Sequence, residues 1–392
     1  MRTEGDFIKI HEWLTPLSWL YGLGVGFRNL LFRLGVLKSR AFDIPVISVG
    51  NITVGGSGKT PHVEYLVSLL LDKMKVAVLS RGYKRKSRGY VLANNESTMS
   101  QIGDEPYQMK QKFPALYVAV DKKRTRGIDI LTSDERTKDV DVILLDDAYQ
   151  HRYVKPGVNI LLVDYHRLII YDKLLPAGCL REPQEGKSRA DIVIITKCPK
   201  DLRPMEYRVL TKALDLYPYQ SLYFTTLVYD DLKPVYGKGS IALNSLPKGC
   251  NVLLLTGIAS PKQMQTDLSV CNFNLHQLAF PDHHNFSKKD VRTINGKFAE
   301  LPSPKLIITT EKDVSRIKFI EGFEQEVKDN MYALPVRIQF MLEQEENFNN
   351  KIINYVRKNS RNSILVKTKD DNKSQNGNHS RNGAGSISFR NN

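Results

Sequence analysis

The fold is decided by residues 45–73, which read PVISVGNITVGGSGKTPHVEYLVSLLLDK. A short apolar run, a glycine-rich segment and an apolar run at helical spacing predict a strand, a loop and a helix. Glycines let consecutive N–H groups turn inward, the helix N-terminus faces the anion, a lysine reaches the β- and γ-phosphates, and a hydroxyl meets Mg²⁺. The stretch therefore predicts a nucleoside triphosphate site formed by Gly55, Gly56, Ser57, Gly58, Lys59 and Thr60.

One position departs from the strict phosphate-loop pattern G-x-x-x-x-G-K-[ST], because Thr53 stands where the first glycine belongs. That glycine shapes the start of the loop rather than contacting the phosphates most directly. The alternative is an ordinary glycine-rich turn. The strand before the loop and the helix after it favour a phosphate loop.

Short apolar runs recur along the chain, separated by helix-like stretches. We predict strands at 47–51, 75–80, 115–120, 141–147, 158–165 and 190–197, and a second series at 221–229, 251–260, 304–313 and 331–340. Such alternation predicts an α/β fold, a P-loop NTPase-type mostly parallel sheet with helices on both faces, plus a smaller second α/β lobe. The predicted division is a docking segment at 1–40, a P-loop core at 41–225, the smaller lobe at 226–356 and a tail at 357–392.

The formal net charge of +15 implies an acidic partner: nucleic acid, an anionic membrane or a phosphorylated substrate. The tail at 357–392 holds eight Lys or Arg against two Asp, and it has too little apolar surface to fold, so we predict disorder there. Much of the charge therefore lies outside the folded part, and we expect no nucleic acid. The four cysteines lack metal-ligand spacing and fit a reducing compartment, and the N-terminus has no secretory signal pattern.

Residues 13–27 contain no charged residue and hold both tryptophans, with Arg28, Arg33, Lys38 and Arg40 following. Fifteen residues fall short of the roughly 20 that a spanning helix needs. Aromatic rings beside basic residues suit the membrane interface, so we predict an amphipathic, membrane-interfacial helix. The alternatives are a buried packing helix, or two short helices broken near Pro16.

Acidic residues follow the predicted strand of "DVILLDDAYQH", where Asp146 and Asp147 stand at its C-terminal end. Ligands bind at that edge of open α/β sheets, and Mg²⁺-dependent sites take an acidic residue there. The alternative is a pair of solvated loop aspartates. A base for an acceptor hydroxyl could come from Asp104 and Glu105 in "GDEP", or from Asp282, His283 and His284 in "FPDHH", although such loops are often only surface loops.

Seven motifs follow one another in an order that resembles a known family. They are "VGNITVGGSGKTP", "SRGY" (80–83), "GDEP" (103–106), "LDDAYQH" (145–151), "LREP" (180–183), "FPDHH" (280–284) and "TTEKD" (309–313). Together they resemble the tetraacyldisaccharide 4′-kinases, the lipid A 4′-kinases (LpxK family) of Gram-negative bacteria. The resemblance runs from about Trp13 to about Phe340.

The resemblance implies transfer of the ATP γ-phosphate to the 4′-hydroxyl of a tetraacylated glucosamine disaccharide 1-phosphate, with ATP and Mg²⁺. It implies a peripheral or monotopic enzyme at the cytoplasmic face of the inner membrane, and no obligate protein partner is inferred. It assigns catalysis to Asp104 with His283 as its partner, beside Lys59. Expected lipid contacts are Gln150, His151, Arg181, Glu182, Arg81 and Tyr83, and expected metal contacts are Thr60, Asp146, Asp147 and Glu105.

Other functions remain open at this point. A P-loop GTPase or metallochaperone-like switch would read guanine through N-K-x-D, but "TTEKD" has Glu311 where the asparagine belongs. A kinase for a soluble small molecule would leave residues 13–27 without a use. Arg81 could form a plain structural salt bridge, and residues 194–197 and 309–313 could lie by the nucleotide base, at the lobe interface or at buried strand ends.

Overall fold

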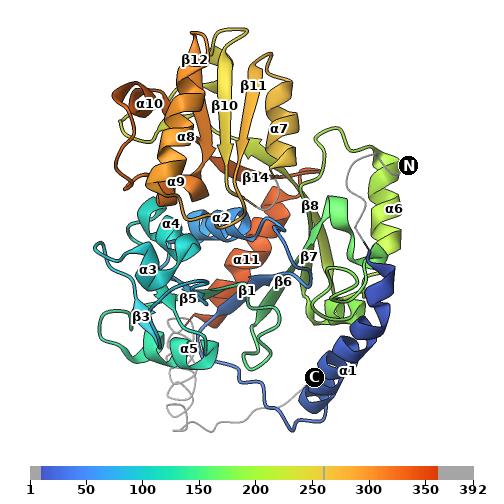
Figure 1. Ribbon diagram of the computed structural model, residues 1–392. Helices are drawn as coiled ribbons and strands as arrows, with labels where there is room; N and C mark the ends of the chain where they lie inside the picture. The colour runs from blue at the N-terminus through green and yellow to red at the C-terminus, as the bar shows by residue number, and fades with distance from the viewer. Residues whose placement is uncertain (1–9, 259–260, 361–392) are drawn as a thin grey trace, which may run out of the picture.

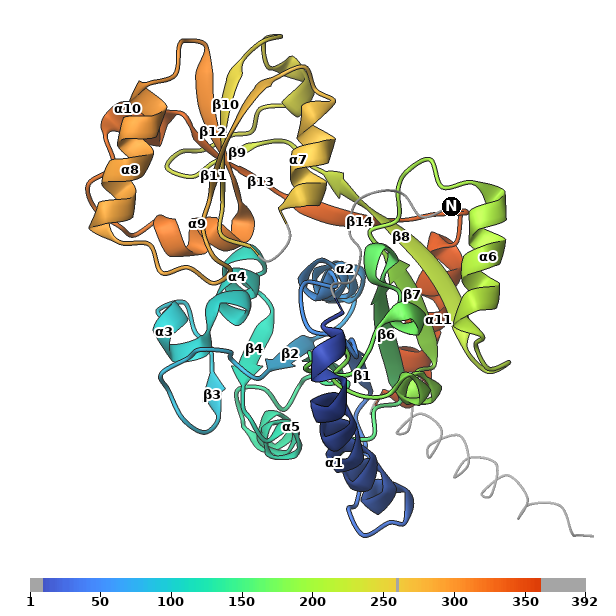
Figure 2. The same ribbon diagram turned by 45° about the vertical axis from the view of Figure 1, so that its right-hand side comes forward.

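The computed structural model describes residues 10–258 and 261–360, which form two α/β lobes stacked one above the other (Figure 1, Figure 2). The large lobe is built on a nine-stranded sheet. From edge to edge its strands are β14 (Val336–Phe340), β8 (Ser221–Tyr229), β7 (Ile192–Thr196), β6 (Val158–Asp164), β1 (Val46–Gly50), β5 (Val142–Asp146), β2 (Val76–Ser80), β4 (Tyr117–Val120) and β3 (Val91–Leu92). Only the edge strands β14 and β3 pair antiparallel with their neighbours.

Helices cover both faces of this sheet, as predicted. They are α2 (Lys59–Leu71), α3 (Met99–Ile102), α4 (Asp104–Lys112), α5 (Arg124–Ser133), α6 (Pro204–Leu214) and α11 (Glu345–Asn359). Strand side chains alternate between two cores: Ile47 packs with α2, α4 and α11, whereas Val46 packs with α5 on the opposite face. The strands are buried on both sides, which explains their near-continuous β-branched composition.

The smaller lobe has a five-stranded sheet in the order β11 (Asn274–Ala279), β10 (Asn251–Thr256), β12 (Lys305–Thr310), β13 (Met331–Leu334) and β9 (Lys233–Pro234). Its helices are α7 (Lys262–Ser269), α8 (Lys288–Ala299), α9 (Glu311–Ile317) and α10 (Gln325–Asp329). Strand β11 was not predicted. It is an exposed edge strand whose polar sequence NLHQLA lacks the apolar run used to find the others.

The predicted strand at 331–340 is wrong as a single strand. Pro335 divides it into β13 in the smaller sheet and β14 in the larger one. Proline has no N–H to donate to a sheet, so the ladder breaks there and the chain crosses between lobes. The segment that first leaves the large lobe, after β8, lies beside this returning segment, because the Asp230 N–H donates to the Pro335 carbonyl at 3.1 Å.

The predicted end of the smaller lobe at residue 356 also needs correction. The chain rejoins the large sheet at Val336, and α11 buries Phe348, Ile352 and Val356 in the core of the large lobe. These residues recur every four positions, so a single helix face covers the sheet. Helix α11 continues to Asn359, into the stretch predicted to be a disordered tail, and residues 361–392 of that tail lie outside the described residues.

Near the N-terminus, a short 3₁₀ turn η1 (Glu12–Leu14) leads into the continuous helix α1 (Thr15–Arg33). Pro16 does not break it, because proline is tolerated in a first helical turn. The helix is not buried either, since Trp19, Leu23 and Phe27 expose more than three-fifths of their surface. Within the described residues, no helix is long and apolar enough to cross a membrane.

Candidate functional site

The predicted phosphate loop lies between β1 and α2, at the carboxyl edge of the large sheet. Gly55 and Gly58 have φ values of +100° and +81°, which side chains disfavour, so these glycines are needed where they stand. Helix α2 begins at Lys59, so its free N-terminal N–H groups and its dipole face the loop. The six predicted residues thus lie together at the start of α2, where a helix N-terminus could receive an anion.

Thr53 has a role that a glycine could fill less well. It forms an isolated antiparallel bridge with Leu180. The Val54 N–H donates to the Cys179 carbonyl at 2.8 Å, and the Arg181 N–H donates to the Ile52 carbonyl at 2.7 Å. The start of the loop is therefore a short extended strand paired with the segment that carries Arg181, and an extended strand favours a β-branched residue over glycine.

Asp146 ends β5 and Asp147 follows it, and the two carboxyl groups are in opposite electrostatic states. Burial, with Glu105 and Asp147 nearby, raises the pKa of Asp146 to about 7. Burial would also raise the pKa of Asp147, but the Lys59 ammonium and the Arg181 guanidinium hold it below its ordinary value. Asp147 lies 3.7 Å from the Lys59 Nζ and 3.5 Å from Arg181, with a left-handed φ of +47°. Such a backbone conformation is uncommon for a residue other than glycine.

The residues near Asp146 fit a Mg²⁺ ion. Its Oδ1 is buried and has no hydrogen-bond partner in the described part of the chain, and Glu105 and Asp147 add negative charge beside it. Across the same residues, no cluster of three or more His, Cys, Asp or Glu side chains gathers as a metal cage. Mg²⁺ usually takes one or two carboxylates and completes its shell with water and phosphate oxygens, so a sparse donor set suits it.

Three of the predicted lipid-contact residues form one hydrogen-bonded group beside Asp147. Arg181 Nη1 lies 3.4 Å from Gln150 Oε1, and Gln150 Nε2 donates to Glu182 Oε1 at 3.2 Å. Glu182 is only 3% exposed and forms an ion pair with Arg189 at 2.7 Å. The buried Glu182 is therefore positioned to orient the Gln150 side chain. The Arg181 guanidinium remains partly exposed and could contact an anion.

The other predicted lipid residues lie farther apart. His151 is partly buried, and burial together with Arg124 lowers its pKa, which keeps it neutral. Tyr83 is 60% exposed and its ring lies 5.3 Å from the imidazole of His283 in the other lobe. Arg81 is exposed, and within the described residues no ion pair is found for it.

Asp104 begins helix α4 and joins the two lobes. Its Oδ2 lies 3.1 Å from His283 Nδ1, 3.0 Å from Arg316 Nε and 2.7 Å from Arg316 Nη2. His283 has a left-handed φ of +57°, which is again uncommon for a residue other than glycine. The carboxylate belongs to the large lobe, whereas both of its partners belong to the smaller one.

These partners set the charge of Asp104. Burial would raise its pKa, but the hydrogen bond from His283 and the charge of Arg316 outweigh burial and hold the pKa at about 2. Lys312 Nζ lies 3.4 Å from His283 Nε2 and can donate to it. His283 Nδ1 also lies 3.0 Å from Arg316 Nη2, so the imidazole contacts Asp104, Arg316 and Lys312 together. The carboxylate stays ionised at neutral pH and is held in one orientation.

The residues of the motifs around the Asp104 junction make different contacts. Lys312 pairs with Glu105 at 3.3 Å, so the "TTEKD" segment lies at the lobe interface. His284 instead bonds Asp290 at 3.1 Å and does not reach Asp104. Arg316 was not predicted, although Lys312 and Arg316 stand four residues apart on one face of α9. Thr310 caps α9 by accepting from the Asp313 N–H at 3.1 Å. This cap is a local sequence signal that could have revealed the helix on which Arg316 lies.

Arg316→Met is expected to destabilise the protein by about 3–5 kcal/mol, because it would leave two carboxylates without their buried counter-charge. Arg316 is 4% exposed and also pairs with the fully buried Asp313 at 3.2 Å. Denaturant unfolding measures this loss. The matched control is Arg337→Met, whose pair with Asp230 is exposed and should cost less than about 1 kcal/mol. Equal losses in the two variants would contradict a structural role for the buried pair.

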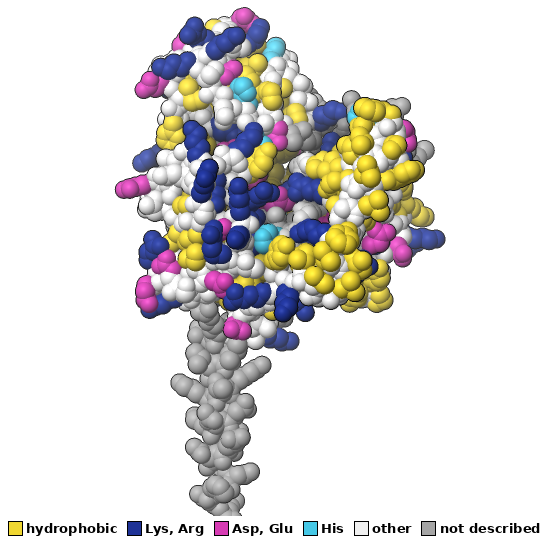
Figure 3. Space-filling view, turned by 60° about the horizontal axis from the view of Figure 1, so that its bottom comes forward, with side chains coloured by type: hydrophobic (Ala, Val, Ile, Leu, Met, Phe, Trp, Pro, Cys, Tyr) yellow, Lys and Arg dark blue, Asp and Glu magenta, His cyan; other side chains and the backbone are white. Residues whose placement is uncertain are grey.

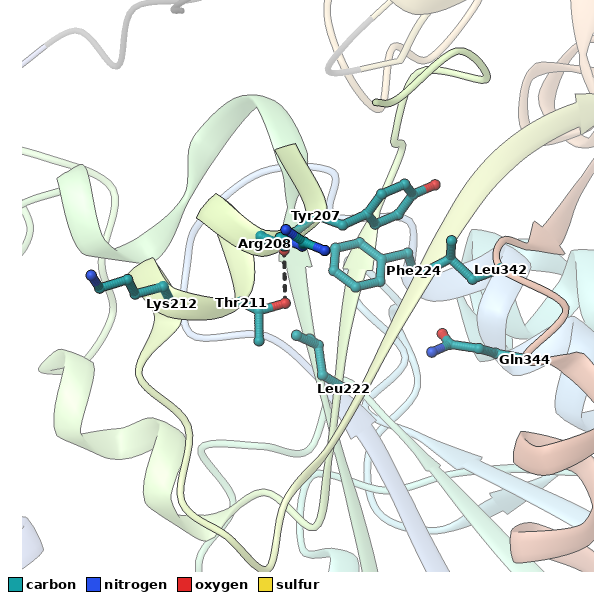
Figure 4. Close-up of a pocket in the computed structure, with 8 residues that line it drawn as sticks. All are labelled: Tyr207, Arg208, Thr211, Lys212, Leu222, Phe224, Leu342 and Gln344. Carbon is teal, nitrogen blue, oxygen red and sulfur yellow. Dashed lines mark hydrogen bonds between the residues drawn. The ribbon is translucent and has the colours of Figure 1, made fainter. Parts of the chain in front are cut away.

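A separate cavity of about 500 Å³ lies beside α6, away from these residues (Figure 4). Its walls come from α6, from β8 and from the turn before α11. The lining side chains are Tyr207, Arg208, Thr211, Lys212, Leu222, Phe224, Leu342 and Gln344. None of the predicted site residues lines it.

Comparison with known proteins gives one consistent result. A family model described as tetraacyldisaccharide-1-P 4′-kinase (LpxK) matches residues 10–357. The chain is 57% identical over 362 residues to a tetraacyldisaccharide 4′-kinase of Phocaeicola vulgatus, covering 92% of this chain and 99% of the relative. It is 45% identical to one of Flavobacterium johnsoniae, covering 88% and 97%. A crystal structure described as the "apo" form of LpxK from Aquifex aeolicus in complex with ATP superposes with a TM-score of 0.67 at 28% identity, covering 88% of this chain and 98% of that one.

Proposed function

The chain belongs to the tetraacyldisaccharide 4′-kinase family, an ATP-dependent kinase family of lipid A biosynthesis, and we propose that phosphate transfer takes place between Lys59 and Asp104. The observation that carries this proposal is the junction at Asp104, where an ionised carboxylate is fixed by His283 and Arg316 of the other lobe. Its neighbour Glu105 acts electrostatically on Asp146, so this junction adjoins the phosphate loop.

In the proposed reaction the acceptor 4′-hydroxyl oxygen forms a bond to the γ-phosphorus, and the bond from that phosphorus to the ADP oxygen breaks. The hydrogen bonds found on the Asp104 carboxylate within the described residues all end on Oδ2. Oδ1 can therefore orient the hydroxyl and accept its proton. A pKa of about 2 makes Asp104 a weak base, which suits a loose transition state in which the proton leaves late.

Lys59 and the loop N–H groups would bind the β- and γ-phosphates. Thr60, Asp146 and Glu105 would hold Mg²⁺, which supplies positive charge to the phosphate oxygens when bound. Asp147 is less suited as a metal ligand because Lys59 and Arg181 already neutralise it. Arg181, with Gln150 fixed by Glu182, would bind the anionic sugar head group of the lipid.

The acyl chains of the substrate call for an apolar surface next to the site, and α1 offers one. Figure 3 shows one face of the molecule, on which hydrophobic side chains gather at one side with Lys and Arg side chains beside them. The exposed apolar residues of this region are Trp13, Leu17, Trp19, Leu20, Leu23, Phe27, Leu30, Leu34 and Val36. We propose that this surface docks on the cytoplasmic face of the inner membrane.

Helix α1 also contacts the head-group loops directly. Tyr21 Oη donates to the Arg181 carbonyl at 2.8 Å, and Arg28 Nη2 donates to the Gln150 carbonyl at 3.0 Å. A docked α1 would therefore hold Arg181 and Gln150 close to the membrane surface, where the sugar of an inserted lipid lies. This arrangement would let the enzyme work on a lipid that remains in the bilayer.

Trp19→Glu and Leu23→Glu are each expected to weaken binding to vesicles that contain anionic phospholipid, by about 10- to 100-fold, because each removes a large apolar group worth about 1.5–3 kcal/mol on burial. Co-sedimentation with the vesicles measures the binding. The matched control is Val270→Glu, which changes an equally exposed apolar residue on the smaller lobe. Unchanged binding of both α1 variants would contradict docking through this surface.

The proposed acceptor is tested by the release of ADP with and without the acylated disaccharide 1-phosphate. Rapid release is expected only when the lipid is present, because Asp104 orients the lipid hydroxyl and not water. Full turnover of ATP without the lipid would contradict the proposal. Preference for GTP over ATP would favour a GTPase-like switch instead.

A further inference from the structure

Three consecutive carbonyl groups of the phosphate loop are each held from outside by a side chain. Lys197 Nζ donates to the Gly56 carbonyl, and Thr196 Oγ1 donates to the Ser57 carbonyl at 3.0 Å. His62 Nδ1 lies 2.7 Å from the Gly58 carbonyl. Thr196 is the last residue of β7, Lys197 follows it directly, and His62 lies in the first turn of α2.

These contacts matter because a trans peptide unit points its C=O and its N–H in opposite directions. A Ser57 carbonyl bonded outward to Thr196 aims the Gly58 N–H inward. A Gly58 carbonyl bonded outward to His62 likewise aims the Lys59 N–H inward. The Gly58 carbonyl also accepts from the His62 N–H at 3.3 Å. The side-chain contacts to the loop carbonyls therefore help to fix the direction of the N–H groups that would face the phosphates.

The neighbours of each bracing side chain hold it in place. His62 is 2% exposed, and its Nε2 lies 3.0 Å from Thr225 Oγ1 on β8. If Nδ1 carries the proton and donates to Gly58, Nε2 accepts from Thr225, so one tautomer satisfies both contacts. Lys197 also pairs with Asp164 at 2.6 Å, at the end of β6. The braces therefore connect the loop to three strands on one side of β1.

We propose that Thr196, Lys197 and His62 are positioning residues that pre-organise the phosphate cradle for the β- and γ-phosphates of the nucleotide. This inference rests on the nucleotide position proposed above for residues 55–60. Without the braces the glycines would let the peptide units rotate, because glycine is conformationally permissive. Nucleotide binding would then also have to order the loop, and the entropic cost of that ordering would weaken the affinity.

The test compares Thr196→Val, which keeps the shape and removes the hydroxyl, with Thr196→Ser, which keeps the hydroxyl. Calorimetry on the full chain without lipid gives the affinities for ATP and for AMP, which lacks the β- and γ-phosphates. We expect Thr196→Val to weaken ATP binding about tenfold with AMP binding unchanged, and Thr196→Ser to bind as the unaltered chain does. His62→Ala should behave like Thr196→Val, with partial recovery in His62→Gln, because glutamine also offers one donor and one acceptor.

Other outcomes would overturn the inference. Equal losses for ATP and AMP would show that the residues support the whole nucleotide or the fold, and unchanged ATP affinity in both Thr196→Val and His62→Ala would show that they brace nothing. The thermal midpoint without nucleotide identifies a variant that has merely lost its fold, and a loss confined to such variants counts against the inference. Failure of the unaltered chain to bind ATP would contradict the proposed function itself, and the inference with it.

Discussion

Lys59→Ala is expected to lower the rate of phosphate transfer by about 10²- to 10³-fold, the loss typical when one group that stabilises charge in the transition state is removed. Lys59 is the first residue of α2, its side chain is 14% exposed, and its Nζ lies 3.7 Å from Asp147. No other ammonium among the described residues stands at the first turn of that helix. Its removal also leaves Asp147 with Arg181 alone as counter-charge, so an incoming phosphate would meet less positive charge.

Initial rates of ADP formation at saturating lipid measure the effect of Lys59→Ala. The matched control is Lys73→Ala, which removes an exposed lysine just beyond the other end of α2 and should leave the rate unchanged. A Lys59→Ala enzyme with more than about half of the original rate would contradict the assignment of the loop as the phosphate site.

Asp104→Asn is expected to lower kcat by about 10²- to 10⁴-fold, the range found for a positioned acid–base group, with little change in KM for ATP. Asparagine keeps the shape of aspartate and one oxygen for Arg316, so the lobe junction should survive. It loses the negative charge that would orient the acceptor hydroxyl and receive its proton. The split between kcat and KM separates this role from nucleotide binding.

The control for Asp104→Asn is Asp129→Asn, whose exposed pair with Arg40 lies elsewhere on the surface and should be dispensable. Binding of ATP to the Asp104→Asn protein, followed directly, should match that of the unaltered chain. Near-normal turnover by this variant would deprive the mechanism of its base. A loss of ATP binding would instead move Asp104 from the transfer step to nucleotide binding.

The strand, loop and helix within residues 45–73 could be predicted because their signals are local. Strand, glycines, Lys59 and the helix start all fall within one short stretch, and backbone preferences act over that distance. Thr53 is intelligible only in three dimensions, because its partner Leu180 is far away in the chain. The bracing carbonyl contacts of Lys197 were equally out of reach, since they connect the ends of different strands.

Arg316 illustrates what a single sequence cannot supply. It lies 212 positions from Asp104, and only the return of the smaller lobe onto α4 brings them together. Glu182 illustrates the converse, because the motif identified it but not its burial, which gives it an orienting role. By contrast, Pro335 and Thr310 are local signals. Pro335 marks the end of a strand and Thr310 the start of a helix, but both lie within apolar runs that we predicted as single strands.

We expect this chain to phosphorylate an acylated disaccharide 1-phosphate. This expectation is tested most directly by incubating the chain with ATP, Mg²⁺ and that lipid, and then analysing the lipid by mass spectrometry with fragmentation. The expected product is a lipid heavier by a single phosphate, located on the 4′-hydroxyl, with little of it formed by the Asp104→Asn protein. Consumption of ATP with an unchanged lipid mass, or a new phosphate at another position, would contradict it.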